Sequence, residues 1–189
     1  MSPVRAVCPP VCLAQTVLPR PAPLDHAALL VPVRFAGPGS KVFFLQFDLG
    51  HPSTVLYANK WASIAARHGL PANGPRLASL DLLLGGAAVR GRGVSLMARE
   101  GAGVDWDQEV ELVGTLGADL IDGRAVRLDF QRDRIRLARD RTGLHGPEAQ
   151  FQPVSFSGRR ILMPIEFEGQ RKTVMYDSGS SAWPGPAAP

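Results

Sequence analysis

Apolar and polar residues alternate most regularly in residues 126–137. On both sides of a turn at Arg132 and Asp133, apolar side chains occupy every second position, with polar or charged side chains between them. A period of two on both arms predicts a β-hairpin with one buried face and one solvated, charged face. Solubility is therefore the simplest explanation for the arginines of this segment.

Two further pairs of apolar runs, each interrupted by a glycine-rich turn, predict two more hairpins. They lie within residues 28–47 and 80–98. Residues 61–69 have helical spacing and end in glycine, which predicts one short helix. Twenty glycines and seventeen prolines divide the chain into short pieces, so the sequence predicts an all-β, mainly antiparallel fold.

The composition narrows the class of protein. With 189 residues, 45% hydrophobic and 20% charged, the chain fits an ordinary globular domain. No apolar run approaches the ~18 residues that a membrane-spanning helix needs. The net charge is +4, and almost all of the positively charged residues are arginines. These arginines are spread along the chain and interleaved with aspartates. This distribution argues against a nucleic-acid partner, which would need a basic face.

The residues that usually bind metals are few and scattered. Cys8 and Cys12 are the only cysteines, and the four histidines stand alone. A metal site needs a cluster of such ligands at suitable spacing. The sequence therefore predicts neither a metal nor a cofactor.

The first 26 residues are predicted to lie outside the fold, as a disordered leader or a poor signal segment. Arg5 followed by apolar residues suggests a secretory signal, but Pro9 and Pro10 interrupt the apolar stretch that such a signal requires. A disordered or mis-started leader explains the segment equally well. The cellular compartment therefore stays open.

An internal repeat is the most informative feature of the chain. Residues 31–37 (VPVRFAG) match residues 163–169 (MPIEFEG), and each copy continues through a basic turn and an apolar strand to an aspartate. The first copy ends in Asp48-Leu-Gly and the second in Asp177-Ser-Gly. Matching units about 130 residues apart predict a duplicated lobe and not a solenoid, whose period would be ~20–50 residues.

Paired aspartates in such repeats suit one kind of chemistry. Two carboxyl groups within ~3 Å cannot both ionise, so they share one proton. One of them can then deprotonate a water while the other protonates a carbonyl oxygen. Each aspartate should follow a strand on a tight turn, and glycine two residues later gives the turn its backbone freedom. A hydroxyl residue between them can bond to the partner loop. The residues predicted to orient the loops are Ser178, Gly50, Gly179 and Ser180.

Residues 174–181 (VMYDSGSS) and 115–121 (TLGADLI) resemble the aspartic proteases of the retropepsin-like and pepsin-like superfamily. The resemblance covers roughly residues 29–183. It implies that each lobe is a small β-barrel, that Asp48 and Asp177 are catalytic, and that Gly117 is structural, in a strand behind the aspartate loop. It also implies a peptide or protein substrate bound in an extended form, no cofactor, and a secreted or periplasmic location.

The resemblance divides the chain into segments. They are a leader (1–26), a first lobe (27–140), a linker (141–158), the start of a second lobe (159–183) and a tail (184–189). The repeat predicts about 100 further residues after Asp177 to complete the second lobe. We therefore expect a truncated or frame-shifted product of a two-lobed gene, with impaired activity. Leu49, where the family has threonine or serine, should cost one inter-loop hydrogen bond and bring an apolar side chain near the charge pair.

Other functions stay open at the sequence level. The chain could be a non-catalytic β domain that binds an extended peptide or partner strand. A homodimer could instead pair two first lobes and bring two copies of Asp48 together. Ser178, Ser180 and Ser181 raise the question of a serine hydrolase, but the chain lacks Gly-x-Ser-x-Gly and a nearby histidine. Changing each aspartate to asparagine would separate hydrolysis, which both changes abolish, from binding, which they leave intact.

Overall fold

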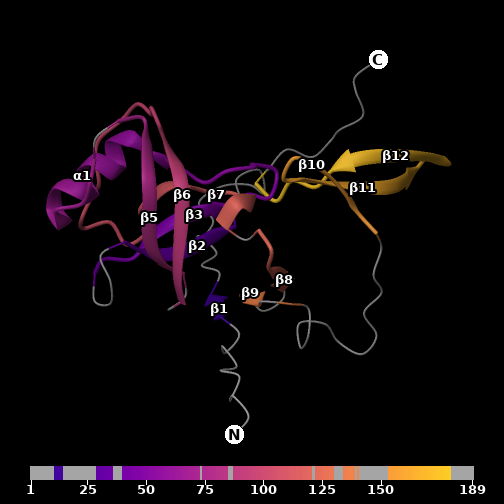
Figure 1. Cartoon of the computed structure of the whole chain (residues 1–189), viewed down its shortest axis with the longest axis horizontal. Helices are drawn as coiled ribbons and strands as arrows, with labels where there is room; N and C mark the ends of the chain where they lie inside the picture. Colours follow the sequence, from indigo (N-terminus) through magenta and orange to yellow (C-terminus); the bar gives the residue numbers. More distant parts are fainter. Residues whose placement is uncertain are drawn as a thin grey trace, which may run out of the picture.

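The computed structural model describes residues 11–14, 29–35, 40–72, 74–84, 87–120, 122–129, 134–138, 140 and 153–179. In these residues the fold is built from β-strands, with a single α-helix, and the predicted all-β class is confirmed. Figure 1 shows a barrel, a small sheet below it, and a long hairpin that extends to one side.

Six strands form a closed barrel in the order β2-β3-β7-β4-β6-β5. The predicted hairpins correspond to the antiparallel pairs β2/β3 and β5/β6, while β7 pairs with β3, and β6 with β4, in parallel. The β5/β6 hairpin is longer than its apolar runs suggested. The strands are β2 (Leu30–Arg34), β3 (Phe43–Phe47), β4 (Val55–Tyr57), β5 (Arg76–Leu84), β6 (Ala87–Met97) and β7 (Leu112–Leu116).

The helix α1 (Ala58–His68) covers one end of the barrel and begins three residues before its predicted start. Gly69 ends it in the left-handed conformation, with φ of 65°, as glycine commonly does after a helix. Trp61 points into the core and meets Phe35 edge-on, with 5.5 Å between the ring centroids. The apolar side of the helix therefore closes the hydrophobic core of the barrel.

A second sheet has the strand order β1-β9-β8. The predicted hairpin of residues 126–137 is present as β8 (Ala125–Asp129) and β9 (Arg134–Ala138). β1 (Val11–Ala14) lies in the segment predicted to be outside the fold, yet it pairs antiparallel with β9. The expectation of a leader without structure therefore does not hold for these four residues.

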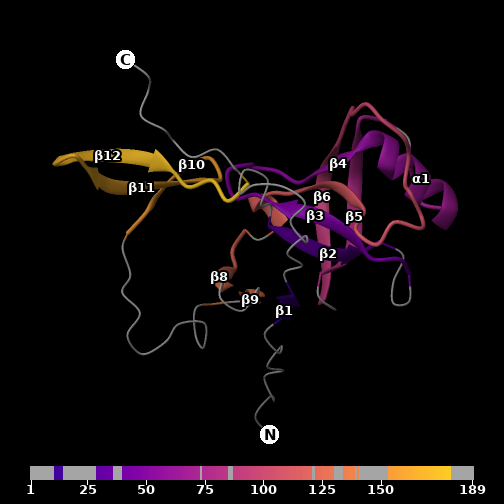
Figure 2. The same cartoon turned by 180° about the vertical axis from the view of Figure 1, so that it is seen from behind.

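A third sheet, β10-β11-β12, forms the long hairpin that points away from the barrel (Figure 2). Its strands are β10 (Ser155–Ser157), β11 (Arg160–Phe167) and β12 (Gln170–Met175). β10 falls within the predicted linker but pairs with β11, so this sheet begins before the expected boundary at residue 159.

Both copies of the repeat form an antiparallel hairpin, β2/β3 in the barrel and β11/β12 in the third sheet. Their surroundings differ. Phe35, in the first copy, is 6% exposed, whereas its counterpart Phe167 is 50% exposed. The same apolar pattern is therefore core in the barrel and surface in the third sheet.

Candidate functional site

The two repeat hairpins bring Asp48 and Asp177 together. Asp48 follows β3, and Asp177 comes two residues after the end of β12. An added Cβ at Gly50 would lie 2.6 Å from Cγ of Asp177, and one at Gly179 would collide with the Asp48 carboxyl group. Each loop thus packs its glycine against the carboxyl group of the other loop.

The two loops share the same internal hydrogen bonds. The Gly50 amide donates to Asp48 Oδ1 at 2.8 Å, and the Gly179 amide donates to Asp177 Oδ1 at 2.9 Å. The His51 amide donates a second hydrogen bond to Asp48 Oδ1 at 3.0 Å. In both repeats the glycine two positions after the aspartate therefore holds that carboxyl group through its backbone.

The reason for the two glycines differs from the one that the sequence suggested. Neither Gly50 nor Gly179 has a positive φ, so neither turn needs a left-handed residue. Instead, the opposite carboxyl group occupies the space that a side chain would fill. Close approach of the two loops, and not backbone freedom, requires glycine at these positions.

Ser178 joins the two loops through its hydroxyl group. Its Oγ accepts a hydrogen bond from the Leu49 amide at 2.9 Å and donates one to the Phe47 carbonyl oxygen at 3.3 Å. Ser178 therefore lies where a loop-orienting hydroxyl was predicted. Ser180, the fourth predicted loop residue, lies outside the described residues.

The side chain of Leu49 is buried behind the first aspartate loop. Its side chain is 5% exposed and belongs to the hydrophobic core cluster of the barrel. Only its backbone amide takes part in the contact with Ser178. An apolar residue at this position therefore strengthens the core behind the loop.

The surroundings of Asp48 raise the pKa of its carboxyl group. Burial raises the pKa of Asp48 most, and the negative charge of Asp177 and a hydrogen bond with its side chain raise it further. Hydrogen bonds from the backbone amides of His51 and Gly50 offset part of this increase in the pKa. Asp48 consequently holds a proton at a higher pH than an isolated aspartate does.

The strand β7 and the following 3₁₀ helix η2 (Ala118–Leu120) support the first loop from behind. The Leu116 carbonyl oxygen accepts a hydrogen bond from the Asp48 amide at 3.1 Å. An added Cβ at Gly117 would lie 2.8 Å from the Thr54 backbone nitrogen and would collide with Ser53. Gly117 thus lies at a point where β7 and the segment after Asp48 come too close for any side chain.

Thr54 was not identified from the sequence, and Asp119 was noted only as part of residues 115–121, although both fix this support. Thr54 is fully buried, and its hydroxyl group accepts a bond from the Gly117 amide at 3.0 Å and donates one to Asp119 Oδ1 at 2.8 Å. The Thr54 amide donates to the same carboxylate oxygen at 2.7 Å. A buried polar residue without a motif gives no signal in a single sequence.

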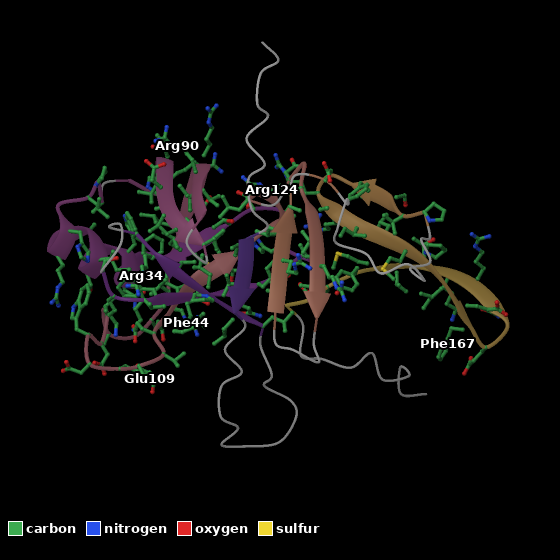
Figure 3. All side chains as sticks on the ribbon, turned by 90° about the horizontal axis from the view of Figure 1, so that it is seen from below. Arg34, Phe44, Arg90, Glu109, Arg124 and Phe167 are labelled. Carbon is green, nitrogen blue, oxygen red and sulfur yellow. The ribbon has the colours of Figure 1, made fainter. Side chains whose placement is uncertain are left out.

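An apolar groove of about 1120 Å³ lies beside the loops, between the barrel and the third sheet. It is lined by Leu49 and Tyr176, the neighbours of the two aspartates, together with side chains from β8, β10 and β11. Arg124, one of its lining residues, lies between the barrel and the long hairpin in Figure 3. The aspartates themselves do not line it, so this groove is distinct from the carboxyl pair.

The described part of the chain holds neither a cluster of metal ligands nor a membrane-spanning helix. Within it, no group of three or more histidine, cysteine, aspartate or glutamate side chains could hold a metal ion. Its one α-helix is too short to cross a membrane.

The comparisons with known proteins found no relatives. No protein-family model, no curated protein and no solved structure matches this chain.

Proposed function

We propose that this chain has the active site of an aspartic-type endopeptidase, with Asp48 and Asp177 as its catalytic pair. The observation that carries the proposal is the reciprocal packing of Gly50 and Gly179 against the opposite carboxyl groups. The resemblance of residues 174–181 to the aspartic proteases supports the same function.

The chemistry assigns a different role to each carboxyl group. Asp48, with its raised pKa, carries the shared proton and donates it to the carbonyl oxygen of the scissile bond. Asp177 takes a proton from a water molecule, whose oxygen attacks the carbonyl carbon. The C–N bond then breaks as Asp177 returns its proton to the leaving nitrogen. Asp48 recovers a proton from the second hydroxyl group of the intermediate, which restores the starting state.

Ser178 contributes by fixing the position of the two aspartate loops relative to each other. Its two hydrogen bonds connect the second aspartate loop to the backbone on both sides of Asp48. A fixed separation of the carboxyl groups keeps them close enough to share a proton. The expected substrate is a peptide in an extended conformation, as the family resemblance implies.

Hydrolysis of an unfolded protein such as reduced, alkylated casein, followed by mass spectrometry between about pH 3 and 7, tests the proposal. We expect Asp48→Asn and Asp177→Asn each to lower the rate by about 10²–10⁴-fold, the usual effect of removing an acid or base catalyst. Asp81→Asn is the matched control, because Asp81 is an exposed aspartate that pairs with Arg90 on the barrel surface. Undiminished hydrolysis in either site variant, or binding of casein peptides without any cleavage by the unaltered chain, would contradict the proposal.

A further inference from the structure

Gln46 makes a contact between the repeats that has no counterpart in the sequence motif. It lies on β3, two residues before Asp48, with a half-buried side chain. Its Nε2 donates a hydrogen bond to the Gly179 carbonyl oxygen at 2.7 Å. A side chain of the first repeat thus holds the backbone of the second aspartate loop.

The residue that Gln46 holds is central to the carboxyl pair. The Gly179 amide donates to Asp177 Oδ1, and its Cα lies against the Asp48 carboxyl group. A change in the backbone angles of Gly179 would therefore alter both contacts together. Restraining the carbonyl group of this glycine limits such a change.

The repeats differ at this position. Two residues before Asp177 the chain has Met175, which is 43% exposed and has no N–H group in its side chain to donate. The amide tether therefore runs from the first repeat to the second and has no equivalent in the reverse direction. Ser178 complements this tether, because its side chain belongs to the second repeat and bonds the backbone of the first aspartate loop.

We propose that Gln46 is a positioning residue, which fixes the Gly179 carbonyl group and thereby the approach of the Asp177 loop to Asp48. The catalytic consequence of this role rests on the proposed peptidase function. The tether itself does not.

The test uses Gln46→Met, since methionine has nearly the same length and shape as glutamine but cannot donate a hydrogen bond from its side chain. The control is Gln170→Met, the same change at an exposed position at the start of β12. Two readouts are compared: the ¹³C chemical shift of the Gly179 carbonyl, which reports its hydrogen bond, and the kcat and KM for casein peptides.

In Gln46→Met we expect the Gly179 carbonyl shift to move and kcat to fall about 10–100-fold, with KM changed less than about 3-fold, as for a small misplacement of a catalytic group. Gln170→Met should leave both readouts unchanged. An unmoved carbonyl shift in a folded Gln46→Met variant would overturn the proposal. So would an unchanged kcat alongside a moved shift.

Gln46→Glu provides a variant whose hydrogen bonding can be switched by pH. A protonated glutamate can donate to the Gly179 carbonyl oxygen, whereas an ionised one cannot and adds a negative charge beside Asp48. We expect its kcat/KM to approach the unaltered value at low pH and to fall faster than that value as the pH rises. A constant ratio across the pH range would overturn the tether.

The two proposals fail in distinguishable ways. If the unaltered chain does not hydrolyse peptides but Gln46→Met still shifts the Gly179 carbonyl resonance, the tether stands and the peptidase function falls. If hydrolysis depends on both aspartates while Gln46→Met alters neither readout, the peptidase function stands and the tether falls.

Discussion

Positions 50 and 179 must be glycine because there is no room for a side chain. In each loop the carboxyl group of the opposite repeat occupies the volume of a side chain. A substitution there acts on the separation of two charged groups, and not only on the local turn. Since each glycine lies against the opposite aspartate, single substitutions can test whether the two loops meet.

Gly50→Ala should destabilise the protein because the new methyl group displaces Asp177. We expect a loss of about 1–3 kcal/mol in the free energy of unfolding, as is usual for overpacking. Asp177→Ala should relieve most of this cost, so a double-mutant cycle measured by urea unfolding should give a favourable coupling energy. Additive effects of the two changes would show that they do not meet.

The raised pKa of Asp48 predicts how stability depends on pH. A group that binds its proton more tightly in the folded state stabilises the fold below its unfolded pKa, and this stabilisation is lost as the pH rises through the folded pKa. An asparagine side chain cannot ionise, so the unfolding free energy of Asp48→Asn relative to the unaltered chain should increase as the pH is raised from about 3 to 7.

Asp81 provides a control because its pKa is shifted in the opposite direction to that of Asp48. Its hydrogen bonds to Arg90 lower its pKa, so its ionised form stabilises the fold above the unfolded pKa. Asp81→Asn should therefore lose stability relative to the unaltered chain as the pH rises. Parallel pH curves for the Asp48 and Asp81 variants would contradict this assignment.

Among the elements, β7 and η2 determine where the first aspartate loop lies. The buried hydroxyl group of Thr54 connects these two elements, because it forms hydrogen bonds with both the Gly117 amide and the Asp119 carboxylate. The hydroxyl group thereby links the residue that follows β7 to the 3₁₀ helix η2.

Thr54→Val keeps the shape of the side chain but removes the hydroxyl group, so Asp119 and the Gly117 amide each lose a partner. We expect a loss of about 1–3 kcal/mol in stability and faster hydrogen exchange of the Gly117 amide. Thr54→Ser keeps the hydroxyl group and should preserve slow exchange. Equal exchange rates in the two variants would argue against the bond.

Elements with local signals could be predicted from the sequence. Alternation and turn residues were enough for the hairpins, and helical spacing with Gly69 was enough for the helix. β4 (Val55–Tyr57) was missed because three buried residues show no alternation and its partners are far away in sequence. Gln46 was missed because a polar residue at an alternate position of a strand looks solvent-facing, and its partner lies in the other repeat.

At the scale of the whole molecule, the apolar face of the third sheet is exposed at Phe156 and Phe167 and partly buried at Ile161. Phe156, Ile161, Met163, Ile165 and Phe167 lie on one side of β10 and β11, as the alternation and register require. Phe156 and Phe167 are 65% and 50% exposed. The first repeat buries the same pattern inside the barrel, so the difference lies in what surrounds each copy.

This face should bind a hydrophobic dye. We expect the unaltered chain to enhance the fluorescence of 8-anilinonaphthalene-1-sulfonate at neutral pH while its thermal unfolding remains cooperative. The double variant Phe156→Ser and Phe167→Ser should reduce the enhancement with little change in the melting temperature, because neither side chain is buried. A strong loss of stability would instead mean that these rings are covered in solution.

The central claim is that Asp48 and Asp177 hold one proton between them, and a ¹³C NMR titration of their side-chain carboxyl groups tests it most directly. We expect Asp48 to hold its proton to a higher pH than an isolated aspartate, because the neighbouring Asp177 carboxyl group raises its pKa. Asp177→Asn should lower the apparent pKa of Asp48 toward its ordinary range. Titration of Asp48 near pH ~4, unaffected by the change at position 177, would contradict the claim.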